Sequence, residues 1–94
     1  MQIRFYVNAD TGEPHIYDHQ VTEEEVEQVL ASPLEERSGE EGASLCLGRT
    51  HDGRFLRVVY VPDPEPDSVF VITAYEPGPK VLKALRRRLR KKQR

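Results

Sequence analysis

Apolar residues recur along the chain at spacings that distinguish strands from helices. Over residues 2–8 they alternate, with Ile3, Phe5 and Val7 on one side, and this period of two predicts a strand. Three further segments of apolar or alternating residues predict strands at about 43–50, 54–61 and 68–75. One strand thus opens the chain, and three more follow in its second half.

The clearest local signal is a helix start at Thr22. Thr22 can cap a helix, and Glu25, three residues later, can reach back to the Thr22 amide as in a capping box. The apolar stripe that begins at Val26 recurs at i+3 and i+4, which is the helical period. Pro33 then disfavours helical backbone at the residue before it. These features predict a helix over about residues 23–31.

The segments between these elements have the composition of connections. Residues 14–19 are predicted as a short helical turn, because a proline opens them. The polar residues 34–42 are predicted as a mobile loop. Asp52 and Gly53 favour a tight hairpin turn, and the proline-rich residues 62–67 predict a stiff, extended connection.

Leu82, Leu85 and Leu89 recur at i, i+3 and i+7 among lysines and arginines, so residues 80–94 are predicted as a basic amphipathic helix. The order of elements predicts an α+β fold: strand, helix, three-stranded antiparallel meander, helix. We expect one domain over residues 1–79, with the basic helix docked on it or extending from it. Apolar residues on both faces of the last two strands predict cover on both faces, or cover on one face and a partner on the other.

Charge is divided between these two parts of the chain. Residues 1–79 hold five basic and all 16 acidic residues, whereas residues 80–94 hold nine basic residues and no acidic one. Such a basic segment can neutralise nucleic-acid phosphates, lie on an anionic membrane or dock on an acidic protein. Alternatively, it is a solvated helix face that balances the acidic body of its own chain. Nucleic acid is the reading we favour.

Size and composition exclude several classes of protein. A chain of 94 residues is too short for a large cofactor-enclosing enzyme, and we expect no cofactor. The single cysteine, Cys46, allows no intramolecular disulfide and no Cys-x-x-Cys zinc site, and we expect it to pack in the sheet. No apolar run approaches the roughly 20 residues of a membrane span, and the N-terminus lacks an apolar signal core. We therefore predict a cytoplasmic protein with no membrane partner.

Histidines and strand arginines are the candidates for chemistry. His15, Asp18 and His19 are close enough for a loop metal site, although we expect ordinary loop residues and no metal. A second set, the arginines on or beside the central hairpin, comprises Arg49, Arg54 and Arg57. An arginine among apolar strand residues is costly unless it is paired or binds an anion. Pairing with a carboxylate such as Glu76 is one interpretation, and contact with phosphate or RNA is the other.

Several segments, in their order along the chain, resemble BrnT-like members of the RelE/ParE-like toxin superfamily and related small bacterial domains. They are FYV at 5–7, HQVTEEEVEQVL at 19–30, LGRTHDGRFLRVVYV at 47–61, VFVITAYE at 69–76, and the basic end. This resemblance implies a small α+β domain that acts as a type II toxin. Such a toxin is a metal-independent endoribonuclease that a cognate antitoxin protein controls.

On this resemblance Arg54 matches the family's Gly-Arg hairpin position and would clamp a phosphate. The residues expected to hold the RNA backbone are Arg49, Arg57, Arg86, Arg87 and Arg90. His51 and Tyr75 are candidates for proton transfer on chemical grounds. However, Tyr75 stands where the family carries an arginine, and the Glu and Tyr usual in the family's terminal helix are absent. The alternative is a non-catalytic binding module whose basic C-terminal helix docks on RNA, the ribosome or an acidic protein.

Overall fold

A computed structural model describes residues 1–92 of the chain. The elements are a five-stranded sheet, two α-helices and two short 3₁₀ helices. Their bounds are β1 (Gln2–Phe5), η1 (His15–His19), α1 (Glu23–Ala31), β2 (Pro33–Ser38), η2 (Glu40–Gly42), β3 (Ser44–Arg49), β4 (Phe55–Pro62), β5 (Ser68–Tyr75) and α2 (Pro79–Lys92). The predicted α+β class is confirmed.

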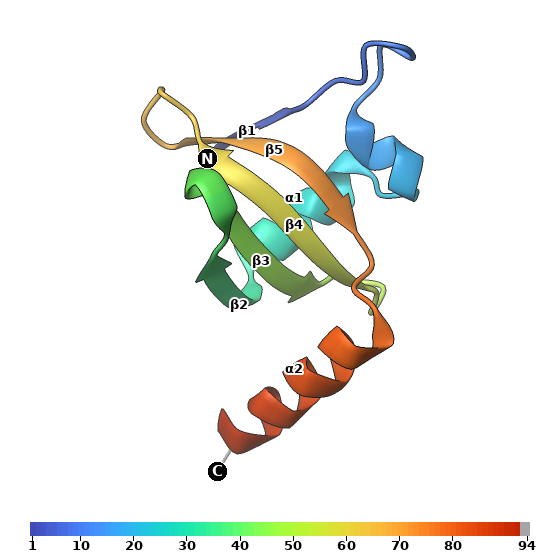
Figure 1. The fold of residues 1–94 in the computed structure, drawn as a ribbon, viewed down its shortest axis with the longest axis vertical. Helices are drawn as coiled ribbons and strands as arrows, with labels where there is room; N and C mark the ends of the chain where they lie inside the picture. The colour runs from blue at the N-terminus through green and yellow to red at the C-terminus, as the bar shows by residue number, and fades with distance from the viewer. Residues whose placement is uncertain (93–94) are drawn as a thin grey trace.

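The strand order in the sheet is β1-β5-β4-β3-β2. β1 pairs parallel with β5, and every other neighbouring pair is antiparallel. Figure 1 shows α1 behind the sheet and α2 extending beyond the end of the sheet where β5 finishes. The two helices therefore do not form one layer.

Elements with strong local signals lie where the sequence predicts them. The helix predicted over residues 23–31 is confirmed as α1, and its capping box is present: the Glu25 amide donates to the Thr22 hydroxyl at 3.2 Å, and the Thr22 amide donates to the Glu25 carboxylate at 3.0 Å. The strand predicted at 68–75 is confirmed as β5. The basic helix is confirmed through Lys92, and positions 93–94 of that prediction lie outside the described residues.

The prediction of a mobile loop over residues 34–42 is wrong in its first part. Residues Pro33–Ser38 form β2, which pairs antiparallel with β3 and lies at an edge of the sheet. An edge strand pairs on one side only and commonly carries charged side chains. For this reason the glutamates and arginine that suggested a loop are compatible with a strand. The antiparallel part of the sheet has four strands, not three.

The hydrophobic core lies between α1, η1 and one face of the sheet. Val26 and Val29 of α1 are fully buried, as are Leu56 and Val58 of β4. Cys46 belongs to the same cluster, and burial raises the pKa of its thiol to about 12. A thiol with so high a pKa stays protonated and is a poor nucleophile. The expectation that Cys46 is a packing residue is confirmed.

The opposite face of the sheet, which we call the open face, is covered only at one end. There Leu85 of α2 is buried, and Arg88 of α2 forms an ion pair with Glu35 of β2. Other apolar side chains of this face, such as Leu45 and Val59, remain partly exposed. Of the two arrangements that the sequence left open, the structure shows cover by α1 on one face and a largely open second face.

No helix within residues 1–92 has both the length and the apolar character needed to cross a membrane.

The contact between α1 and β3 can be tested at Gly48. A methyl group added at Gly48 would lie 2.7 Å from Cγ1 of Val29, in the buried core. Overpacking of this kind costs about 1–3 kcal/mol, so Gly48→Ala should lower the free energy of unfolding by that amount in denaturant titrations. Gly78→Ala is the matched control, because no atom lies within 4 Å of its added methyl group. Equal stability of the two variants would contradict this packing.

Candidate functional site on the open face of the sheet

Arg57 occupies the middle of the open face. The strand register places it opposite Leu47 of β3 on one side and opposite Tyr75 of β5 on the other. Glu35 of β2 is in turn opposite Leu47, so one row of four residues crosses the sheet from its edge to β5. Arg57 therefore lies in the central strand of the five-stranded sheet, on the face that α1 does not cover.

Arg57 has no carboxylate within 4.0 Å among residues 1–92. Its one hydrogen bond is a long contact of 3.4 Å from Nη1 to the Tyr75 hydroxyl, and its Nε is buried without a partner in the described chain. The Thr73 hydroxyl, also on β5, is likewise buried without a partner. A partly buried guanidinium with an unsatisfied N–H is costly until an anion or an acceptor reaches it. The open face thus holds two unsatisfied polar groups on neighbouring strands.

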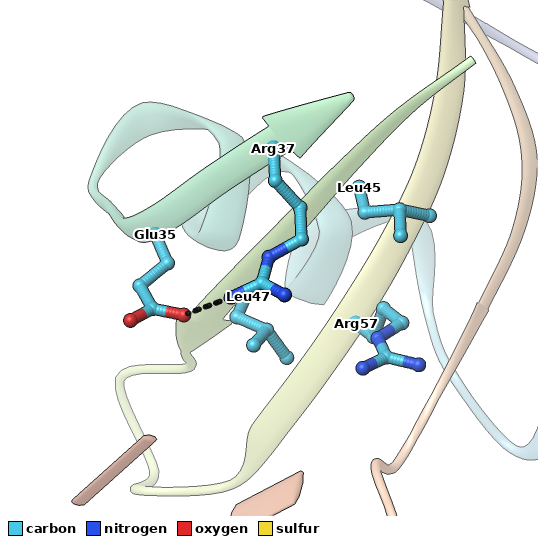
Figure 2. A pocket seen from close by; sticks show the side chains of 5 residues that line it. All are labelled: Glu35, Arg37, Leu45, Leu47 and Arg57. Carbon is cyan, nitrogen blue, oxygen red and sulfur yellow. Dashed lines mark ion pairs between the residues drawn. The ribbon is translucent and has the colours of Figure 1, made fainter. Parts of the chain in front are cut away.

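A small hollow adjoins Arg57 (Figure 2). It is lined by Glu35, Arg37, Leu45, Leu47 and Arg57 and has a volume of about 10 Å³, which is room for one water-sized group. In Figure 2 the Arg37 guanidinium points to Glu35, with 3.6 Å between the paired atoms, whereas Arg57 lies apart from both. The hollow can admit a phosphate oxygen but not a nucleobase, so a larger ligand has to lie across the face.

Glu35 is not available as a general base. Its carboxylate accepts hydrogen bonds from Arg88, of which the one from Nη2 measures 2.7 Å. The hydrogen bonds from Arg88 hold the pKa of Glu35 below its usual range, although burial acts in the opposite direction. Glu35 therefore remains ionised and serves to anchor α2 on β2.

A second group of cations surrounds Phe55, two residues before Arg57 on the same face. The guanidinium carbons of Arg49 and Arg86 lie 5.4 and 5.6 Å from the centre of the Phe55 ring. Neither arginine has a carboxylate within 4.0 Å in the part of the chain that the structure describes. Two residues of strand span about 7 Å, so positive groups continue from the centre of the sheet toward α2.

Tyr75 lies between Arg57 and the histidines of η1. Its ring centre is 5.9 Å from that of His19, and the His19 ring is 5.4 Å from that of His15. In the sequence His19 is a candidate only as a metal ligand, and its place beside Tyr75 has no signal there. Residues 1–92 contain no group of three side chains arranged to hold a metal ion. His19 and Tyr75 are instead a pair of titratable groups beside an arginine.

Arg54 has a different role from Arg57, because its side chain is fully engaged within the chain. Its Nε donates to Glu76 at 2.6 Å, and its Nη1 donates to the Gln20 carbonyl at 2.8 Å and to Glu25 at 3.1 Å. Its Nη2 donates to the His19 carbonyl at 3.4 Å. The pairing with Glu76 that the sequence analysis considered is present, and the geometry favours a structural brace over a phosphate clamp.

The other predicted site residues lie in three different places. His51 is in the turn between β3 and β4, where its amide donates to Gln28 of α1 at 2.9 Å, so it lies on the α1 side of the sheet. Arg86 and Arg90 line a hollow at the start of α2 together with Leu82 and Glu76. Arg87 is exposed on α2. Of the three predicted catalytic residues, only Tyr75 lies beside Arg57.

Comparison with known proteins gave one match. Residues 16–76 match DUF4258, a domain of unknown function. The chain belongs to this family. No curated protein and no solved structure matched the chain.

The DUF4258 region contains η1 from its second residue, α1 and all four antiparallel strands. It therefore includes Arg57, Tyr75 and His19, as well as the Arg54 brace. It ends before α2, so the basic helix lies outside the matched region. The candidate site consists of a centre within the DUF4258 region and a cationic flank beyond it.

The brace at Arg54 can be tested by stability and its pH dependence. Arg54→Ala leaves Glu25, Glu76 and two carbonyls without their donor, and hydrogen bonds to charged groups are worth about 1.5–3 kcal/mol. We expect a loss of unfolding free energy of that order near neutral pH, measured by denaturant titration. Loss of less than about 0.5 kcal/mol, the usual range for surface substitutions, would contradict a bracing role.

The pH dependence isolates the contribution of Glu25. Burial alone would raise the pKa of Glu25, but the Thr22 amide and Arg54 together bring it below its ordinary value of 4.5. A carboxyl group with a lowered pKa stabilises the fold above its unfolded pKa, and this stabilisation is lost as pH falls through the folded pKa. The stability difference between wild type and Glu25→Gln should therefore shrink below about pH 4.5. Glu24→Gln, at the exposed neighbouring position, is the matched control, because Glu24 forms no hydrogen bond and no ion pair through its side chain within residues 1–92.

Proposed function

We propose that this DUF4258 domain binds RNA through the open face of its sheet, with Arg57 holding a backbone phosphate. The observation that carries the proposal is the position of Arg57: central in the sheet, partly buried, and without a carboxylate partner within residues 1–92. Arginine suits this task because its planar guanidinium matches the geometry of phosphate oxygens.

The distribution of charge around Arg57 supports an extended polyanion as the ligand. Arg49 and Arg86 continue the positive surface from Arg57, and Arg87 and Arg90 extend it along α2. Phe55 and Tyr75 add aromatic rings to the same face, and rings on a sheet surface can stack with unpaired bases. A single phosphate ion would use only the centre of this surface, whereas an RNA strand would use all of it.

Cleavage of the bound RNA is the second candidate function, and the contact between Tyr75 and His19 favours it. Both groups can exchange protons. The Tyr75 hydroxyl lies 3.4 Å from Nη1 of Arg57, the cation proposed to hold the phosphate, and the His19 ring centre lies 5.9 Å from that of Tyr75. In such a site one of them would take the proton of a ribose 2′-hydroxyl, whose oxygen then bonds to the adjacent phosphorus. The bond from phosphorus to the 5′-oxygen of the next nucleotide breaks, and the other group gives a proton to that oxygen. Arg57 stabilises the charge that develops on the phosphate. This chemistry is the metal-independent cleavage that the toxin resemblance implies. If the protein cleaves RNA in this way, we propose that it does so in the cytoplasm and that an antitoxin protein controls its activity.

Binding is tested by titrating the full chain with fluorescent single-stranded RNA at several salt concentrations. Arg57→Ala should weaken binding about tenfold or more and reduce the slope of log K against log salt by about 1, the value for one lost phosphate contact. Arg4→Ala is the matched control, because Arg4 is a strand arginine that is paired with Asp63 and does not line the hollow at Arg57. If both variants bind as wild type does, the open face does not hold the RNA.

Cleavage is tested in the presence of EDTA, at concentrations where binding is saturated. Tyr75→Phe or His19→Ala should reduce the rate about 100-fold, the scale of one general acid–base group, with little change in RNA affinity. The products should end in 2′,3′-cyclic phosphate, since the 2′-hydroxyl is the attacking group. If the RNA stays intact under these conditions, RNA cleavage is excluded as the function, and RNA binding without catalysis remains.

A further inference from the structure

The basic side chains of α2 are mostly without partners inside the described chain. Arg88 is the one residue of this helix that forms an ion pair with the body of the protein within residues 1–92. Seven other basic residues are exposed: Lys80, Lys83, Arg86, Arg87, Arg90, Lys91 and Lys92. Beside the buried Leu85, the stripe residues Leu82 and Leu89 are only partly buried. The helix thus presents an amphipathic, cationic surface that its own chain does not cover.

The outer side of α1 has the complementary character. Glu24 and Glu27 are exposed, and neither has a cationic partner within 4.0 Å in the structurally described part of the chain. Two hollows, of about 390 and 260 Å³, meet along this side, since Glu27 and Ala31 line both. Ile3 and Leu30 line the smaller hollow, so its wall is apolar below an acidic rim.

The two surfaces cannot satisfy each other within one chain. α1 lies behind the sheet, whereas α2 extends past the end of the sheet and is fixed on the open-face side by the ion pair between Arg88 and Glu35 (Figure 1). Charge complementarity can be met between copies instead. We propose that two copies of this chain associate, with α2 of each copy lying in the hollow along α1 of the other.

Each copy gives its α2 to the other and receives the other's α2, so the two copies form a dimer with two-fold symmetry. Both surfaces of each copy are then used, and no further copy is needed. The partly buried leucines of α2 would meet Ile3 and Leu30, while the arginines would meet Glu24 and Glu27. Exposed ion pairs are individually weak and are screened by salt. The dimer is therefore expected at low ionic strength and should dissociate as salt is added. The proposal requires α1, α2 and Ile3 of β1. It shares Arg86 and Arg90 with the proposed RNA surface but does not use Arg57, the centre of that surface.

A charge-swap experiment tests the pairing directly. One variant carries Arg86→Glu and Arg90→Glu on α2, and the other carries Glu24→Arg and Glu27→Arg on α1, which leaves the Glu25 capping box intact. Each variant alone brings like charges together and should remain monomeric at about 0.01 M salt, where wild type has twice the monomer mass by light scattering. An equimolar mixture restores opposite charges at both contacts and should again give the dimer mass.

Salt and a site variant provide the controls. The wild-type dimer should be lost at about 1 M salt, where the screening length is only about 3 Å. Arg57→Ala should dimerise as wild type does, although its RNA binding is weakened, so failure of this proposal is distinguishable from failure of the RNA site. A monomeric wild type at low salt, or a mixture that stays monomeric while both variants are folded by circular dichroism, would overturn the proposal.

Discussion

Arg54 joins three parts of the chain that are distant in sequence, and the geometry of the open face depends on this contact. Its guanidinium donates to the end of η1, to Glu25 in the first turn of α1 and to Glu76 directly after β5. Glu76 follows Tyr75, and the carbonyl of His19 also accepts from Arg54. The brace therefore holds the backbone beside Tyr75, which contacts Arg57, and beside His19, whose ring lies next to that of Tyr75. Arg54 donates to several acceptors in different directions, which also explains why a lysine could not replace it: one ammonium cannot span such a fork.

The contrast between Arg54 and Arg57 follows from the pleat of the sheet. Arg54 precedes β4 and projects to the α1 side, where carboxylates and carbonyls are available. Arg57, an odd number of positions later, projects to the other face, where its side chain makes one hydrogen bond within residues 1–92, to the Tyr75 hydroxyl. Two arginines three residues apart therefore have opposite roles. Arg54 stabilises the fold, and its N–H donors are therefore not available to a ligand. Arg57 is available to a ligand because the fold supplies few acceptors for its N–H donors.

Local signals in the sequence were sufficient for most of the fold but for only part of the site. The capping box at Thr22 and the apolar period from Val26 determine α1 within its own segment, so it was predictable. β2 was not, because a charged edge strand is specified by its pairing with β3 rather than by its own pattern. Arg57 and Tyr75 could be named as candidates, since alternation assigns strand residues to faces. The place of His19 beside Tyr75 depends on how η1 packs against β5, and no spacing in the sequence encodes that contact.

The division of charge along the chain corresponds to a division in space. The glutamates at the start of α1 lie on the far side of the sheet from Arg57, and the cations of α2 lie on the open-face side. An acidic body would repel RNA if its charge were spread evenly, but at 0.15 M salt the screening length is only about 8 Å. Charges across the sheet, which is covered by α1, therefore act weakly on a ligand at Arg57, whereas Arg49 and Arg86 act on it directly. The net charge of the chain is thus a poor guide to its partner, and the local field of the open face is the relevant quantity.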